Sequence, residues 1–353
     1  MENESNSPLI SIIIVSYNGK DFLLSCLDSV FKSNYKNFEV ILVDNASTDQ
    51  SHIMAKNQFE KIILINNPTN MGPVGRNSGI LKAQGKFVVL LDFDTIVTPN
   101  WLNEFLASYE KHGYGLYQGK LLFMDDHKKI NSAGCMINIF GFSFARGSGE
   151  VDSGQFDDLL EINFPATACA FIPRDVFDKV GLFDTEFFAY VEDTDFGWRT
   201  LLQGIKSYFA PEVIVYHKGS PTTQWSSKKF FYLERNRQIC LYSNYSRRTF
   251  FTLLPFLFVI EFGTMLLYLK HGMFSEKIRS YLYILKNQKY LKQRYSEINS
   301  RRKISDSDLV LQFSDQVWTP KNVLGDKTNH LFNKVISKLS FASKSLLKTR
   351  EGK

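Results

Sequence analysis

The chain has 353 residues, of which 44% are hydrophobic and 22% are charged. This length exceeds that of one small module, and the composition excludes a disordered or fibrous protein. The charge is uneven, because residues 1–270 contain 25 basic and 29 acidic residues whereas residues 271–353 contain 17 basic and 7 acidic ones. The net charge of +6 therefore arises in the C-terminal part, and it suits either nucleic acid or an anionic membrane.

The four cysteines are scattered, with no CxxC motif and no short secreted framework: Cys26, Cys135, Cys169 and Cys240. This pattern predicts reduced thiols in a cytosolic compartment rather than disulfides or a zinc site. Residues 1–8 form a polar tail without an apolar signal segment. We therefore expect the folded part to face the cytosol.

Strands and helices are predicted to alternate along the first hundred residues. Continuous apolar runs predict buried strands at residues 9–15, 38–43, 62–66 and 87–91. Helices are expected at residues 21–31 and from about Pro73 to Gly85, and Ser47 and Gln50 have the spacing of a capping box for a short helix. This alternation predicts a mainly parallel sheet flanked by helices, whose ligands bind beyond the carboxyl ends of the strands.

Polar residues gather where three of these strands end. They are Ser16, Tyr17 and Asn18 after the first strand, Asp44, Asn45, Ser47 and Asp49 after the second, and Asp92 and Asp94 after the fourth. A solvated loop explains any one group, but three groups on one edge of a sheet favour a binding site.

The later part of the chain gives fewer signals. Residues 115–165 are rich in glycine, and no topology is predicted for them. A helix is expected at residues 175–180, ended by Gly181. A second helix with an acidic start is expected from residue 192 to a stop at Gly204, followed by a strand at residues 213–216.

The triplet Asp92-Phe93-Asp94 places two carboxylates directly after a buried strand. Such a pair suits a hard divalent cation, since Mg²⁺ takes one or two carboxylates and leaves positions open for phosphate oxygens. The alternative is a pair of helix-capping acids ahead of Pro99.

A second acidic cluster comprises Glu192, Asp193 and Asp195. Acids in a first helical turn are favoured by the helix dipole, which is the structural alternative. Three acids in four residues also repel one another, so we expect at least one carboxylate with a raised pKa that would act as a proton acceptor. His217 ends a predicted strand, where a histidine is usually a hydrogen-bonded surface residue, and only Asp94 favours a metal-binding role for it.

Seven short motifs follow one another between residues 9 and 244: residues 16–18, residues 43–49, residues 70–72 with 76–79, residues 92–94, residues 181–184, residues 192–199 and residues 216–220. Together they resemble the family 2 glycosyltransferases of the GT-A fold, and within them the rhamnosyltransferase-like branch. The resemblance implies an α/β fold of the GT-A nucleotide-diphospho-sugar transferase type.

The resemblance also implies roles for single residues. Asp44 would bind the nucleotide base with Tyr17 packing nearby, Arg76 would face the diphosphate, and Asp92 would contact the ribose. Asp94 and His217 would hold a Mg²⁺ or Mn²⁺ ion. Asp193 would be the general base, and Glu192 would orient the acceptor.

Residues 249–269 are long enough to cross a bilayer, but they include Glu261 and have basic residues at both ends. A transmembrane helix and a helix lying in the membrane surface are both possible, and we favour the second. The expected division is a polar tail at 1–8, the transferase domain at 9–245, a hydrophobic and basic membrane-associated helical region at 246–304 and a basic tail at 305–353. Aromatic residues alternate with basic ones at 276–303, but their closeness to the apolar segment favours an anionic membrane over nucleic acid as partner.

The sequence thus predicts an inverting, metal-dependent glycosyltransferase that moves a sugar from a nucleotide-diphosphate donor to a lipid-linked or cell-envelope glycan. We expect it at the cytoplasmic face of the cell membrane. One alternative is a sugar nucleotidyltransferase, for which the first strand lacks a glycine-rich phosphate loop. The other is a catalytically inactive binding module at the membrane, against which the acids and His217 argue.

Overall fold

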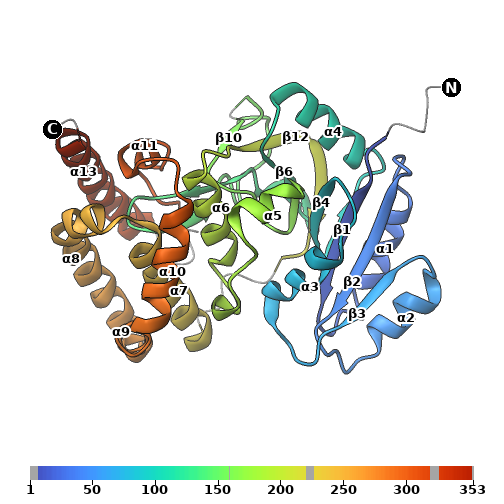
Figure 1. The fold of residues 1–353 in the computed structure, drawn as a ribbon, viewed down its shortest axis with the longest axis horizontal. Coiled ribbons are helices and arrows are strands. Elements are labelled where there is room, and N and C mark those ends of the chain that lie inside the picture. Colours follow the sequence, from blue (N-terminus) through green and yellow to red (C-terminus); the bar gives the residue numbers. More distant parts are fainter. Residues whose placement is uncertain (1–6, 159, 220–225, 319–325, 352–353) are drawn as a thin grey trace. The chain divides into compact units, whose positions relative to one another are not determined.

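The computed structural model describes residues 7–158, 160–219, 226–318 and 326–351 (Figure 1). The chain forms two compact units. The described residues of the first unit fall within Met1–Cys135, Ala145–Ala189 and Ile205–Ser220. Those of the second fall within Met136–Phe144, Tyr190–Gly204 and Pro221–Lys353.

The first unit is built on a mixed sheet of ten strands. Its main path runs in the order β10 (Glu161–Ile162), β12 (Ser207–His217), β6 (Leu116–Phe123), β11 (Cys169–Pro173), β4 (Phe87–Asp92), β1 (Ile10–Ser16), β2 (Phe38–Asp44) and β3 (Ile63–Asn66). Strand β5 (Thr95–Val97) pairs with β12, and β7 (Asp126–Ser132) pairs with β6. Strands β4, β1, β2 and β3 are parallel neighbours, whereas β11 is antiparallel to β4 and β6. The predicted α/β fold is confirmed.

Helices cover both faces of this sheet because the side chains of β1 alternate. Ile12 and Ile14 join the core formed with α1 (Leu23–Phe31) and α4 (Trp101–His112). Ile13 faces α3 (Arg76–Lys82) on the opposite side, and a Cβ atom added to Gly79 would lie 2.5 Å from its Cγ2. The glycine therefore lets α3 lie close against the sheet.

The remaining elements of this part are short. They are α2 (Ser51–Gln58), the 3₁₀ helices η2 (Gly72–Gly75) and η3 (Thr185–Phe187), and α5 (Asp175–Val180). The paired strands β8 (Cys135–Ile137) and β9 (Ser143–Ala145) fall mostly within the second unit. The helix predicted to end at Gly181 is confirmed. The capping box is wrong, because α2 begins after Gln50 without a side-chain cap and Ser47 Oγ instead accepts a hydrogen bond from the backbone nitrogen of Asn18.

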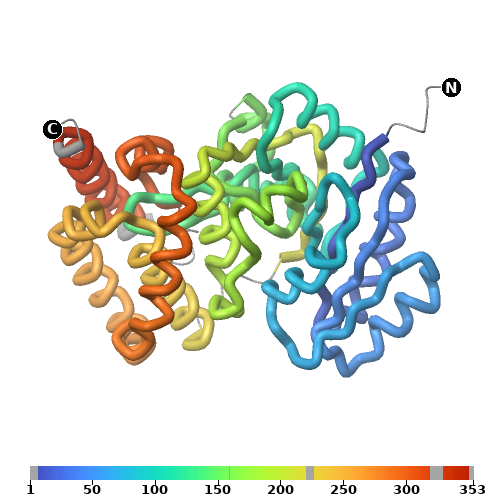
Figure 2. Tube along the Cα trace, in the orientation of Figure 1, coloured from blue at the N-terminus to red at the C-terminus, as the bar shows by residue number. Residues whose placement is uncertain are grey.

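The second unit is helical (Figures 1 and 2). Its helices are α6 (Glu192–Leu202), α7 (Ser227–Asn244), α8 (Arg247–Lys270), α9 (Phe274–Lys286), α10 (Gln288–Arg301), α11 (Asp306–Leu311) and α13 (Asp326–Glu351). Helix α7 packs against α6, α9 and α10, and α13 packs against α8 and α11. Whether residues 9–245, which include α6 and α7, fold without the helices that follow them stays a prediction.

The four cysteines are free thiols, as the sequence predicts, and all four are buried. Burial raises the pKa of Cys26 to about 12, and it also raises the pKa of Cys169 and Cys240. A buried thiol that stays protonated is a poor nucleophile and a poor metal ligand. The cysteines therefore contribute packing rather than chemistry.

Candidate active site

The carboxyl ends of β1, β2 and β4 lie side by side at one edge of the sheet. The strand register pairs Ser16 with Asp44 and Val15 with Asp92. Tyr17, which follows β1, is 44% exposed, whereas Asp44 at the end of β2 is buried. The polar residues after these three strands therefore belong to one edge, as the sequence predicts.

Asp92, Asp94 and His217 form a cluster at this edge. His217 Nε2 lies 3.5 Å from Asp94 Oδ1 and 3.8 Å from Asp92 Oδ2. The cluster forms because β5 pairs antiparallel with β12, which sets His217 opposite Thr95 and lets the backbone nitrogen of Lys218 donate to Asp94 O over 3.0 Å. One side-chain atom from each of the three residues lies within 4.8 Å of the other two.

The imidazole of His217 is oriented by Asn131, a residue of β7. The two side chains meet at 3.1 Å between Nδ1 of His217 and Oδ1 of Asn131. An Nδ1–H that donates to this oxygen leaves the lone pair of Nε2 directed at the two acids, which is the arrangement that metal-binding histidines use. Burial alone would lower the pKa of His217, but Asp94 and Asp92 outweigh it and the net shift is upward.

These three side chains fit a divalent metal ion. Two carboxylates and one imidazole nitrogen are donors that Mn²⁺ accepts, and the carboxylates alone suit Mg²⁺. The acids remain accessible, since the side chain of Asp92 is 35% exposed and that of Asp94 is 18% exposed. Open ligand positions on an ion held here would face solvent or a phosphate group.

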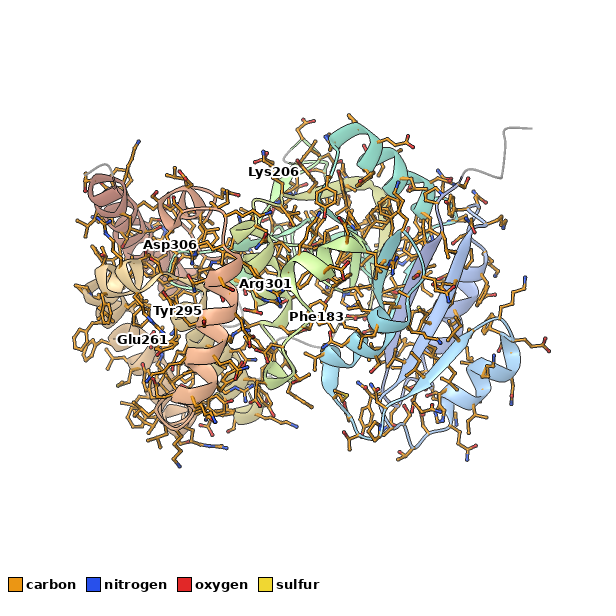
Figure 3. All side chains as sticks on the ribbon, in the orientation of Figure 1. Phe183, Lys206, Glu261, Tyr295, Arg301 and Asp306 are labelled. Atoms are coloured by element: carbon orange, nitrogen blue, oxygen red, sulfur yellow. The ribbon has the colours of Figure 1, made fainter. Side chains whose placement is uncertain are left out.

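Arg76 places a buried cation beside this cluster. The residue opens α3, is 4% exposed and has its guanidinium over the ring of Phe183, which Figure 3 labels. Its Nη2 lies 3.4 Å from Asp92 Oδ1, and its Nη1 has no hydrogen-bond partner among the described residues. A buried guanidinium with an unused donor suits an anionic ligand such as a diphosphate.

Asp44 has a neighbour that the sequence analysis missed. Its Oδ2 accepts from the backbone nitrogen of Ser47 over 3.0 Å, and its Oδ1 lies 3.5 Å from Nδ1 of His52. Both Asp44 Oδ1 and His52 Nδ1 are buried and make no hydrogen bond among the described residues. The pair therefore holds an acceptor and a ring nitrogen ready for a polar ligand.

Glu192 and Asp193 lie in the second unit, at the start of α6. All residues of α6 are described, and Asp193 alone among them is not buried. Its Oδ1 accepts from the backbone nitrogen of Thr194 over 2.7 Å. Asp193 is therefore the least buried residue of α6.

The backbone in front of α6 is strained. Tyr190 and Val191 have φ angles of 65° and 67°, in the left-handed region that a β-branched residue rarely occupies. Asn236 of α7 is fully buried and donates through Nδ2 to the carbonyl oxygen of Tyr190 over 2.7 Å. This contact, which sequence reasoning could not find, supports the strained turn that precedes Glu192 and Asp193.

Asp195 is not the acid with a raised pKa that is expected in this turn, and for Glu192 and Asp193 the expectation stays a prediction. Burial raises the pKa of Asp195, but the charges of Arg294 and Arg199 outweigh burial and hold the pKa below its usual value. Asp195 is 1% exposed and points into the helical unit. Asp195 therefore has different surroundings from Asp193, which is not buried.

Comparison with known proteins agrees with this geometry. The chain is 29% identical over 223 residues to the UDP-Glc:alpha-D-GlcNAc-diphosphoundecaprenol beta-1,3-glucosyltransferase WfaP of Escherichia coli, covering 60% of this chain and 77% of the relative. It is 28% identical over 218 residues to an uncharacterized glycosyltransferase of Rickettsia prowazekii, covering 61% and 65%. The chain spans 25%, 65% and 50% of the lengths of three curated relatives that it matches.

Two solved structures have a similar fold. GalNAc-T7, crystallised with UDP, GalNAc and Mn²⁺, gives a TM-score of 0.57 at 18% identity over 71% of this chain and 51% of that one. Residues 1–349 of S. aureus TarS in complex with UDP give a TM-score of 0.51 at 16% identity over 98% of this chain and 92% of that one. Together with the acidic edge of the sheet, these similarities show that the chain has the GT-A fold.

The family model for glycosyl transferase family 2 matches residues 11–181. Residues 11–181 therefore form a glycosyl transferase family 2 segment, and the resemblance to family 2 glycosyltransferases seen in the sequence is confirmed, whereas the rhamnosyltransferase-like branch stays a prediction. The matched segment contains Tyr17, Asp44, Arg76, Asp92 and Asp94.

Proposed function

We propose that this protein transfers a sugar from a nucleotide-diphosphate donor to a lipid-linked or cell-envelope glycan, with inversion at the anomeric carbon and with a divalent metal ion. The observation that carries the proposal is the cluster of Asp92, Asp94 and His217 at the carboxyl edge of the sheet. The relatives support it, since WfaP is named for transfer from UDP-Glc to a diphosphoundecaprenol-linked sugar.

The donor is proposed to lie along the edge of the first unit. Asp44 accepts a hydrogen bond from the base, Tyr17 packs against the nucleoside, and Asp92 contacts the ribose. Arg76 holds the diphosphate through its unused donor. Asp94 and His217 would hold Mg²⁺ or Mn²⁺, and the ion would supply positive charge that neutralises the diphosphate.

The transfer itself needs one base and one stable leaving group. Asp193 takes the proton of the acceptor hydroxyl while that oxygen forms a bond to the anomeric carbon. The bond from the anomeric carbon to the diphosphate oxygen breaks on the opposite face, and its electron pair leaves with the nucleoside diphosphate. Arg76 stabilises the negative charge on that group, and Glu192 orients the acceptor.

The place of the reaction is proposed to be the cytoplasmic face of the cell membrane. Helix α8 is long and apolar enough to cross a bilayer, and it is the only such helix among the described residues. A lipid-linked acceptor would lie at that surface. We therefore propose an anionic membrane as a partner in addition to the two substrates.

The experiment incubates the full chain with nucleotide-diphosphate sugars that differ in base and sugar, together with a diphosphate-lipid acceptor. We expect one donor to yield a glycosylated lipid whose new linkage has the anomeric configuration opposite to that of the donor, as read by NMR. This panel includes a deoxyhexose donor, as the rhamnosyltransferase-like branch suggests. A product that retains the donor configuration would contradict Asp193 as a base in a single displacement.

A further inference from the structure

One face of α8 is a continuous apolar stripe open to solvent. The exposed large side chains occur at steps of three and four residues: Phe251, Leu254, Phe258, Phe262, Leu266 and Leu269. This spacing averages the 3.6 residues of a helical turn, so the side chains line up over about 27 Å. Val259, Pro255 and Gly263 are exposed as well. We call these nine residues the outer face of α8.

The opposite face of α8 is bound to the rest of the helical unit. Its buried residues are Thr249, Thr252, Leu253, Leu257, Ile260, Thr264 and Tyr268. The single acid of the helix, Glu261, is labelled in Figure 3 and pairs with Arg237 of α7 and with Lys277 of α9. These two bases are 4% and 0% exposed, and both also contact Glu234 of α7.

This network decides between the two orientations that the sequence left open. A helix that crosses a bilayer must meet lipid or other membrane-embedded protein around its whole circumference. The inner face of α8 instead meets two charged helices, and its acid is held by two buried bases. Because charged groups are costly in hydrocarbon, α7 and α9 cannot follow α8 into a bilayer.

We infer that α8 lies flat in the headgroup region of an anionic bilayer, with its outer face toward the acyl chains. This inference rests on the proposed membrane location and does not depend on the proposed sugar transfer. Arg248 and Lys270 are exposed at the two ends of the stripe, and no acid lies on the outer face between them. Apolar residues between basic ends match the boundary between acyl chains and anionic headgroups.

A neighbouring helix adds to this match. Helix α13 packs against α8, and the two lie side by side in Figures 1 and 2. On α13, Lys334, Lys338 and Lys348 are exposed together with Leu331 and Phe341. Both helices therefore present apolar and basic side chains and no exposed acid over these positions.

A second copy of the chain fits the outer face less well than lipid does. An antiparallel pairing of two such helices would set the basic residue at one end against the basic residue at the other end. Two like charges at each end oppose this association. Lipid phosphates at the same positions would instead neutralise them.

The test measures flotation of the full chain with phosphatidylcholine vesicles, with and without phosphatidylglycerol. We expect binding that needs phosphatidylglycerol and that alkaline carbonate reverses. Phe258→Glu with Phe262→Glu should lower the bound fraction about tenfold or more, because two charges enter the apolar stripe. The matched control is Leu81→Glu on α3, since Leu81 is 76% exposed outside this stripe and its replacement should leave binding unchanged.

A second variant separates charge from apolar burial. Arg248→Ser with Lys270→Ser should lose about tenfold in preference for phosphatidylglycerol while keeping its helical circular dichroism. Retention of the wild-type protein after carbonate would show a spanning helix and overturn the inference. So would a dimer, seen by light scattering, that the Phe258/Phe262 variant abolishes. Donor hydrolysis without lipid is measured in parallel, so that a failure of the proposed reaction is distinguished from a failure of docking.

Discussion

Arg294 of α10 donates a hydrogen bond to Asp195 of α6, two residues after Asp193. The other oxygen of Asp195 accepts from Nε of Arg199 over 2.8 Å, and Asn244 of α7 donates to the first over 3.2 Å. Asp195 is therefore a junction at which α7 and α10 meet α6. Through it, the C-terminal helices fix the helix that carries the proposed base.

Removing the charge of Arg294 should destabilise the protein strongly. In Arg294→Met the buried carboxylate keeps Arg199 but loses its second cation, and breaking a buried pair in this way costs about 3 to 5 kcal/mol. The measurement is the free energy of unfolding in urea. Lys179→Met serves as control, because the exposed pair of Lys179 with Asp175 should contribute less than about 1 kcal/mol. An equal loss of unfolding free energy in the two variants would show that the buried pair contributes no more stability than the exposed pair.

The same junction predicts a loss of stability in acid. The pKa of Asp195 is lowered in the folded state, so the unfolded chain binds a proton first as the pH falls. The contribution of Asp195 is fully present above the pKa of an unfolded aspartate, about 3.9, and is lost as the pH falls through the lower folded value. Unfolding measured from pH 7 down to pH 3 should show the stability gap between wild type and Arg294→Met narrowing at the acid end. A gap that widened there would contradict the direction of the shift.

The fold could be predicted where the hydrophobic pattern is unambiguous. The runs that become β1, β2 and β4 are buried on both faces and read as parallel strands. Strand β11 could not be placed from its own pattern, because pairing between β4 and β6 depends on contacts far apart in sequence. The inward direction of Glu261 could not be predicted either, because its partners Arg237 and Lys277 lie in other helices.

Asp193→Asn should remove the proposed base while preserving its shape. We expect the rate of transfer to fall by roughly 10²-fold or more, the usual scale for a general base. Donor binding, measured by calorimetry with the nucleoside diphosphate, should be unchanged. Asp178→Asn on α5 is the control, because Asp178 is an exposed acid of the first unit. Near-normal turnover of Asp193→Asn would show that another residue is the base.

Asn236 should affect the rate through the turn that it holds. In Asn236→Ala the carbonyl of Tyr190 loses this donor, and the left-handed backbone at Val191 can relax. We expect a lower kcat with a nearly unchanged KM for the donor, because the donor residues lie in the first unit. The control Gln293→Ala removes an exposed amide of α10 that bonds Glu297. A change in KM alone would argue against a role in positioning α6.

The candidate site was visible in sequence only in part. Asp92 and Asp94 follow a strand whose end could be predicted, so their position at the sheet edge could be predicted too. Asn131 was not, because it lies in β7, inside the glycine-rich segment for which the sequence gives no topology. His52 was missed because its closeness to Asp44 depends on the direction that α2 takes after β2.

Metal dependence is tested by measuring the release of UDP from UDP-glucose, or from the best donor of the panel, as a function of Mn²⁺ concentration. The wild-type chain should need Mn²⁺ or Mg²⁺ and be inactive in EDTA, and Asp94→Asn should be inactive at every metal concentration. Asn131→Ala should need about tenfold more metal, the usual effect of losing a residue that orients a ligand. The control Asp126→Asn, on the same strand, changes a side chain that is 42% exposed and paired with Lys129, and it should match wild type. Full release in EDTA, with Asp94→Asn as active as wild type, would contradict a metal site at Asp92, Asp94 and His217.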